Sequence, residues 1–161
     1  MTRHRQDPCF MKLESSIKEI ERCLEHHNKI NLTVSQKSVG WHLHHLALTN
    51  AVVIGAMHRS NPDEFALEEN PTRENVMGRG TIIRGHVRTP DALNPDDTMD
   101  LKKIEQAVSH MNNALATWDT IKDNAFFIHP FMGKLNKALT LKFMTIHNSH
   151  HLKIIDDILR L

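Results

Sequence analysis

Tyrosine is absent from this chain of 161 residues, and cysteine occurs only twice. The two cysteines, Cys9 and Cys23, do not form a CxxC pair, so we expect reduced thiols in a cytoplasmic protein. No apolar run approaches the length that crosses a bilayer, and the first ten residues lack the apolar core of a signal peptide. The sequence therefore predicts no contact with a membrane.

Neither sign of charge dominates the composition. Lys and Arg together number 20, Asp and Glu number 19, and the net charge is +1. A balance this even provides no basic surface that would attract a phosphate backbone, so nucleic acid is not an expected partner. Apolar residues make up 40% of the chain, which is ordinary for a globular protein, and we expect residues 1–161 to form a single domain.

Histidine, by contrast, is abundant. The 13 histidines are scattered along the chain, whereas a purification tag would form one block at an end. A single metal ion takes only three or four protein ligands. Most of the histidines are therefore expected at the surface or in ordinary hydrogen bonds, and the question is which few of them share a site.

Apolar residues recur at helical spacing in four segments, which are separated by proline, glycine and polar clusters. The predicted helices cover residues 10–30, residues 39–58, about 20 residues that include Leu101 and Trp118, and residues 136–161. Residues 60–98 and 122–136 are predicted to be connections, the first with a short extended piece at 81–87. The pattern predicts an all-α four-helix bundle, in which the long 60–98 connection allows the second and third helices to run parallel.

The last predicted helix contains the sequence HNSHH, three histidines in five positions. At 100° per residue, setting His147 at 0° places His151 at about +40°. Phe143 then lies at about −40° and Ile154 at about −20°, so both histidines belong to the core-facing stripe of the helix. His150, at about −60°, lies at the margin of that stripe.

Two buried imidazoles one turn apart need partners, because an unpartnered buried polar group costs about 1–3 kcal/mol on mutational scales. One divalent ion would satisfy both, since neutral imidazoles at i and i+4 point the same way. The alternative is a pair of core histidines, each with its own carbonyl or water partner. A third ligand would come from the second predicted helix, where periodicity does not choose among His42, His44 and His45.

Three stretches carry a family resemblance: WHLHHLALTNAVV, HPFMGKLN and HNSHHLKIIDDIL. Together they resemble the DinB/YfiT-like superfamily of metal-binding four-helix bundles, and the HPF-G stretch is similar to one subfamily of that group. The resemblance implies an up-down-down-up bundle that binds one divalent ion through His45, His147 and His151. It also implies a homodimer. Relatives include metal-dependent transferases that attach thiols such as bacillithiol or mycothiol, as well as isomerases and hydrolase-like members.

Three neutral nitrogen ligands leave at least one coordination position free, as catalytic zinc sites do. Zinc and nickel both suit imidazole, and the sequence does not choose between them. Such an ion is a Lewis acid that lowers the pKa of water to about 7, and it would act on a thiol in the same way. The sequence thus leaves open both thiol transfer and hydrolysis of a small-molecule substrate.

Other polar residues near these stretches have weaker claims to a role. His129 is the first candidate for moving a proton, and a structural role in the turn before Pro130 is the alternative. The remaining candidates are favoured as surface, packing or loop residues: His44 and His150 beside the ligands, Thr49 and Asn50 beyond His45, Arg79, Arg84 and Arg88 in a glycine-rich stretch, and His26 and His27 near the end of the first helix.

Two functional alternatives remain open from the sequence. In the first, the bundle is not catalytic, and a metal or buried polar network serves its stability or a partner. In the second, the 13 histidines make the protein responsive to pH, which predicts a change in stability between about pH 5 and 7.

Overall fold

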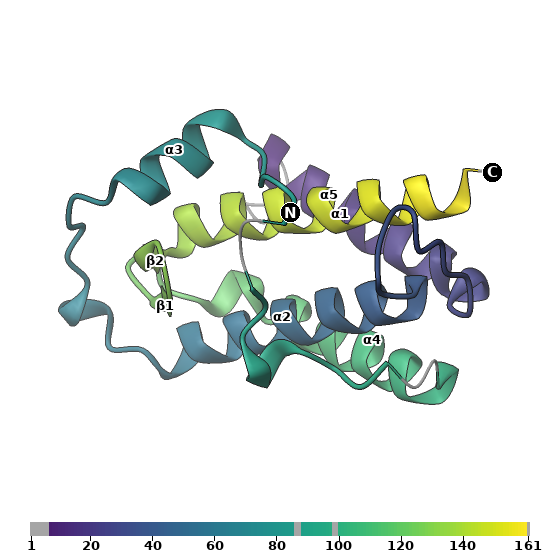
Figure 1. The fold of residues 1–161 in the computed structure, drawn as a ribbon. Coiled ribbons are helices and arrows are strands. Elements are labelled where there is room, and N and C mark those ends of the chain that lie inside the picture. The colour runs from purple at the N-terminus through teal and green to yellow at the C-terminus, as the bar shows by residue number, and fades with distance from the viewer. Residues whose placement is uncertain (1–6, 86–87, 98–99, 161) are drawn as a thin grey trace.

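The computed structural model describes residues 7–85, 88–97 and 100–160. In these residues the protein is mainly helical, with five α-helices and one two-stranded antiparallel sheet (Figure 1). The helices are α1 (Pro8–Arg22), α2 (Val39–Arg59), α3 (Pro71–Arg79), α4 (Leu101–Ala116) and α5 (Lys137–Leu159). Strands β1 (Phe126–His129) and β2 (Gly133–Asn136) form the sheet, and 3-10 turns cover Cys23–His26, Pro62–Glu64, Asp91–Leu93 and Trp118–Thr120.

The long helices begin where the sequence supplies a side-chain cap. The hydroxyl of Ser38 accepts a hydrogen bond from the backbone N–H of Trp41 at the start of α2, and Asp100 and Asn136 cap α4 and α5 in the same way. The first helix is shorter than the predicted 10–30 segment and ends at Arg22. Beyond it the chain turns, so that the carbonyl of His27 accepts from the N–H of Gly40 at 2.8 Å.

Helices α2 and α4 lie side by side and run parallel. At their first turns, Gly40 on α2 faces Ile104 on α4. A Cβ atom on Gly40 would lie only 3.0 Å from the Ile104 side chain, so glycine at this position allows the two helices to approach closely. At their last turns, His58 and Thr117 are hydrogen-bonded at 2.7 Å. The long connection between the two helices therefore returns the chain to the starting end of α2 (Figure 1). The sequence allowed this parallel arrangement, and the contacts at both ends of the two helices show it.

Helix α5 packs against both α1 and α2. The amide of Asn148 donates to the hydroxyl of Ser16 on α1 at 2.9 Å and accepts from the amide of Asn50 on α2 at 3.0 Å. The apolar core between the four long helices and the hairpin includes the fully buried side chains of Leu13, Ile20, Leu43, Leu46, Ile54, Met57, Met111, Leu135, Met144 and Ile155. Burial of these side chains supplies the main favourable free energy of folding.

Two elements were not expected from the sequence. Residues 122–136, predicted to be a loop, contain the β1–β2 hairpin, in which Gly133 begins β2 directly after the turn at a φ of 67°. The prediction of a loop over these residues is wrong, because a two-stranded hairpin is stable only when it packs on other elements, a contact the local sequence does not reveal. Helix α3 was also missed, although Asn70 caps it and Gly80 ends it in the left-handed conformation.

The extended piece predicted at 81–87 does not form a strand in its described part, residues 81–85, and residues 86–87 lie outside the described chain. Among the described residues, none of the helices is both long enough and apolar enough to cross a bilayer.

Candidate metal centre

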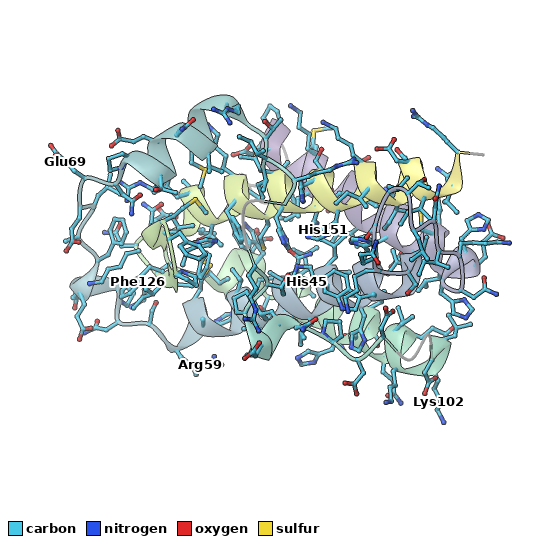
Figure 2. The ribbon with its side chains drawn as sticks, viewed as in Figure 1. His45, Arg59, Glu69, Lys102, Phe126 and His151 are labelled. Carbon is cyan, nitrogen blue, oxygen red and sulfur yellow. The ribbon has the colours of Figure 1, made fainter. Side chains whose placement is uncertain are left out.

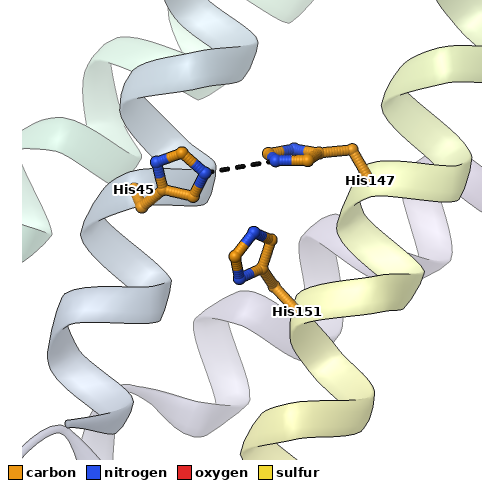
Figure 3. A group of neighbouring side chains, drawn as sticks. All are labelled: His45, His147 and His151. Atoms are coloured by element: carbon orange, nitrogen blue, oxygen red, sulfur yellow. Dashed lines mark hydrogen bonds between the residues drawn. The ribbon is translucent and has the colours of Figure 1, made fainter. Parts of the chain in front are cut away.

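The three histidines matched by the resemblance lie together at the contact between α2 and α5. One ring nitrogen from each of His45, His147 and His151 can be chosen so that all three nitrogens lie within 4.8 Å of one another. Figure 3 shows the three rings. His45 is on α2, whereas His147 and His151 lie one turn apart on α5. Figure 2 shows His45 and His151 near the middle of the molecule, between the ribbons of these two helices. All three side chains are buried, at 3%, 8% and 8% exposure.

The chain fixes the tautomer of His45. Its Nδ1 lies 2.7 Å from the carbonyl oxygen of Leu93, and because a carbonyl only accepts, Nδ1 must carry the proton. Nε2 therefore keeps its lone pair and faces the other two rings. Trp41 stacks on His45 at 5.1 Å between centroids, and its indole N–H contacts Asn94 and the carbonyl of Pro95. The long connection before α4 thus orients the ring of His45.

His147 occupies the opposite side of the group. Its Nε2 lies 3.1 Å from Nε2 of His45, and its ring stacks on Phe143 at 5.4 Å. Because Nε2 of His45 has no proton, His147 must donate in this hydrogen bond when no ion is bound. Its other nitrogen, Nδ1, is then a buried acceptor, and it has no hydrogen-bond partner in the described protein.

His151 completes the group and reaches beyond it. Figure 3 shows one of its nitrogens facing the gap between the other two rings, while the nitrogen next to its attachment point is turned away. That second atom, Nδ1, lies 2.9 Å from Nδ1 of His42. Nε2 of His42 lies 3.1 Å from the hydroxyl of Ser35. The sequence left His42 among three candidates, and the structure places it beside the group rather than within it.

Burial keeps these imidazoles neutral. Desolvation lowers the pKa of His42 to about 3, and neighbouring imidazoles act in the same direction. Burial also lowers the pKa of His45, and it lowers the pKa values of His147 and His151 well below the ordinary value near 6.5. Neutral imidazole is the form that binds a metal ion, so at neutral pH the three rings are ready to act as ligands.

The separation of the His45 and His147 rings fits a divalent ion. Two nitrogens that bind one ion at about 2.0–2.1 Å lie about 2.9–3.4 Å apart for ordinary ligand angles, and the pair in His45 and His147 is 3.1 Å apart. Three buried side-chain atoms lack a hydrogen-bond partner within the described chain: Nδ1 of His147, Oγ1 of Thr49 and Oδ1 of Asn50. Thr49 and Asn50 lie about one turn beyond His45 on α2 and do not belong to the group, and Nδ1 of His147 is not the nitrogen that faces His45. These three atoms therefore do not bear on the metal.

The remaining predicted residues have other surroundings. Nδ1 of His129 accepts hydrogen bonds from the N–H groups of Phe131 and Met132 at 3.1 and 3.2 Å, so its ring holds the hairpin turn. His44 is half-buried on α2, and Arg79 is exposed at the end of α3. Arg88 bonds Asp91 at 3.4 Å, His26 lies in the 3-10 turn after α1, and Nδ1 of His27 bonds the carbonyl of Leu24 at 3.0 Å.

A small pocket lies beside the histidine group. It has a volume of about 80 Å³ and is lined by the 80–84 segment and by one side of α5, including Ser149, His150 and Lys153. The His150 ring contacts that of His151 at 5.0 Å, which connects the pocket wall to the site. Arg84 also lines the pocket and forms an ion pair with Asp157 at 2.7 Å.

In comparisons with family models, curated proteins and solved structures, none matches this chain. The geometry of the site therefore carries the functional conclusions.

Replacing His129 with alanine is expected to lower the free energy of unfolding by about 1–3 kcal/mol, because two backbone donors of the hairpin turn lose their acceptor. Zinc affinity should stay unchanged. His129→Asn should recover most of the stability, since an asparagine side chain also accepts from the backbone two residues on. Urea unfolding and zinc titration measure both quantities. Unchanged stability in His129→Ala would contradict this role.

Proposed function

We propose that the protein binds one divalent metal ion through His45, His147 and His151, and that it belongs with the DinB/YfiT-like bundles that its sequence resembles. The observation that carries the proposal is the convergence of three buried ring nitrogens, from two helices, at mutual distances of at most 4.8 Å. Each residue matched by the resemblance contributes one of these nitrogens. No Asp, Glu or Cys among the described residues joins the group.

The architecture supports this family assignment. We infer an up-down-down-up four-helix bundle formed by α1, α2, α4 and α5, with α3 as an addition to the crossover. The parallel pair α2 and α4, joined by a long connection, is the arrangement that such a bundle requires. A homodimer also remains part of the proposal, and light scattering on the purified protein would test it. The free thiols of Cys9 and Cys23 agree with a reducing, cytoplasmic setting.

The ligand set favours zinc or nickel, since imidazole suits both ions and hard cations such as Mg²⁺ prefer oxygen. When bound by three neutral ligands, the ion would keep its full charge and would act as a Lewis acid toward a thiol or a water molecule. The chain orients the ligands: the carbonyl of Leu93 holds His45, and Phe143 stacks on His147. Burial of the rings limits the access of bulk water.

We propose thiol transfer or hydrolysis on a small, polar molecule as the reaction. The pocket beside the site supports this, because Lys153 and Ser149 offer donors to an anionic or polar group beside His150, whose ring contacts that of His151. The second candidate is a non-catalytic, metal-stabilised bundle. It is favoured by the hairpin role of His129 and by the absence of a carboxylate from the group of histidines, which leaves no obvious acid or base there.

Titration of untagged, chelator-treated protein with zinc and with nickel tests the proposal. We expect saturable binding of one ion per chain at neutral pH. An assay of the loaded protein with low-molecular-weight thiols and electrophiles, and with small esters, separates the two candidates, because only an enzyme turns over. Absence of saturable binding of either ion would overturn the metal site itself.

A further inference from the structure

A fourth buried imidazole, that of His42, lies directly behind the proposed site and contacts His151. His42 is 3% exposed and has two polar contacts, one from each ring nitrogen. Nδ1 lies 2.9 Å from Nδ1 of His151, and Nε2 lies 3.1 Å from the hydroxyl of Ser35. His42 is one turn before His45 on α2, so the same helix that supplies one ligand also presents a partner to another.

The two rings are neutral, so the hydrogen bond between them contains one proton and has a direction. In the first arrangement, Nδ1 of His151 carries the proton and donates to Nδ1 of His42, whose Nε2–H donates to Ser35. His151 then has a lone pair on Nε2, the atom that faces His45 and His147. In this arrangement His151 is a competent ligand.

In the second arrangement every donor and acceptor is exchanged. The hydroxyl of Ser35 donates to Nε2 of His42, and Nδ1–H of His42 donates to Nδ1 of His151. His151 then carries its proton on Nε2, which faces the site and has no lone pair to offer. The oxygen of Ser35 accepts from the N–H of Lys37 at 3.1 Å, and this contact is compatible with both directions.

We propose that His42 is a positioning residue that holds His151 in its metal-binding tautomer and ring orientation by accepting the proton of Nδ1. The inference rests on the proposed metal site and deepens it. His45 receives the equivalent support from the carbonyl of Leu93, which can accept a hydrogen bond but cannot donate one. Because an imidazole can also donate, His42 permits the second arrangement when no ion is bound, and binding of an ion selects the first. Partners of this kind are worth 10–100-fold in metal affinity.

Zinc affinity in three variants tests the role of His42. His42→Phe keeps a buried ring but removes the acceptor, and we expect zinc affinity to fall by about 10–100-fold. His42→Asn places an oxygen near the position of Nδ1 and should restore affinity to within a few-fold of the wild type. His44→Phe is the matched control, since His44 lies on the same helix and outside the group, and its affinity should be unchanged. Competition with a chromophoric chelator measures each dissociation constant.

The outcomes separate this inference from the metal site. If the wild type binds zinc and His42→Phe binds it equally tightly, the inference fails alone. If His42→Phe and His42→Asn lose affinity equally, the effect is one of packing and the inference also fails. If the wild type binds no zinc, both proposals fail together.

A measurement on the wild type does not depend on the variants folding. In the zinc-loaded protein, long-range ¹H–¹⁵N NMR spectra should show a protonated Nδ1 and a metal-bound Nε2 on His151. On His42 they should show a protonated Nε2 and an unprotonated, metal-free Nδ1. A zinc-bound nitrogen on His42, or a proton on its Nδ1, would overturn the inference.

Discussion

Replacing His147 with alanine is expected to abolish the stabilisation of the protein by zinc. At a free zinc concentration of about 1,000 times the dissociation constant, the wild type should gain about 4.1 kcal/mol in unfolding free energy. For a chain of this length, that gain corresponds to a rise of roughly 8–16 °C in melting temperature. His147→Ala leaves only His45 and His151 in the group, so its melting temperature should not rise when zinc is added.

The matched control for this experiment is His150→Ala. His150 lies on the same helix, three residues further along, and does not belong to the group of converging nitrogens. Its removal should leave the zinc-dependent rise intact. Thermal unfolding of all three proteins, with chelator and with zinc, provides the comparison. An equal rise in His147→Ala and the wild type would mean that zinc binds elsewhere.

Lowering the pH from 7.5 to 5 is expected to reduce the unfolding free energy of the metal-free protein by at least about 4 kcal/mol. Burial lowers the pKa of His42 to about 3 and that of His129 to about 4, whereas an unfolded histidine titrates near 6.5. Below about pH 6.5 the unfolded chain therefore binds protons that the folded protein does not. Stability is greatest above this pH and falls toward the folded pKa values, by about 2 kcal/mol for each group at pH 5.

Burial also lowers the pKa values of His45, His147 and His151, so they add to the loss in the same direction. The total approaches the whole stability of an ordinary domain, which is about 5–15 kcal/mol. Urea unfolding in the presence of chelator at pH 7.5, 6.5 and 5 measures the effect. His129→Asn should lose about 2 kcal/mol less than the wild type over this interval. A flat profile between pH 7.5 and 5 would contradict the burial of these neutral rings.

The four long helices could be predicted from the sequence because helix formation leaves a local signature. Apolar residues return to one face every three or four positions, and Ser38, Asp100 and Asn136 supply the caps at the predicted starts. The same local geometry placed His147 and His151 on one face of their helix. The β1–β2 hairpin escaped prediction because its four-residue strands depend on packing against other elements rather than on a long periodic pattern.

By itself, the sequence determined the helical class of the protein and the pairing of two histidines one turn apart on α5. The tertiary structure decided which histidine of α2 joins them, because α2 is apolar nearly all round and only its contacts with α5 distinguish His45 from His42. It also decided the tautomer of His45, since the acceptor is a backbone carbonyl at Leu93, 48 residues away. A backbone carbonyl is present in every residue, so no sequence pattern can mark the one that orients the ring of His45.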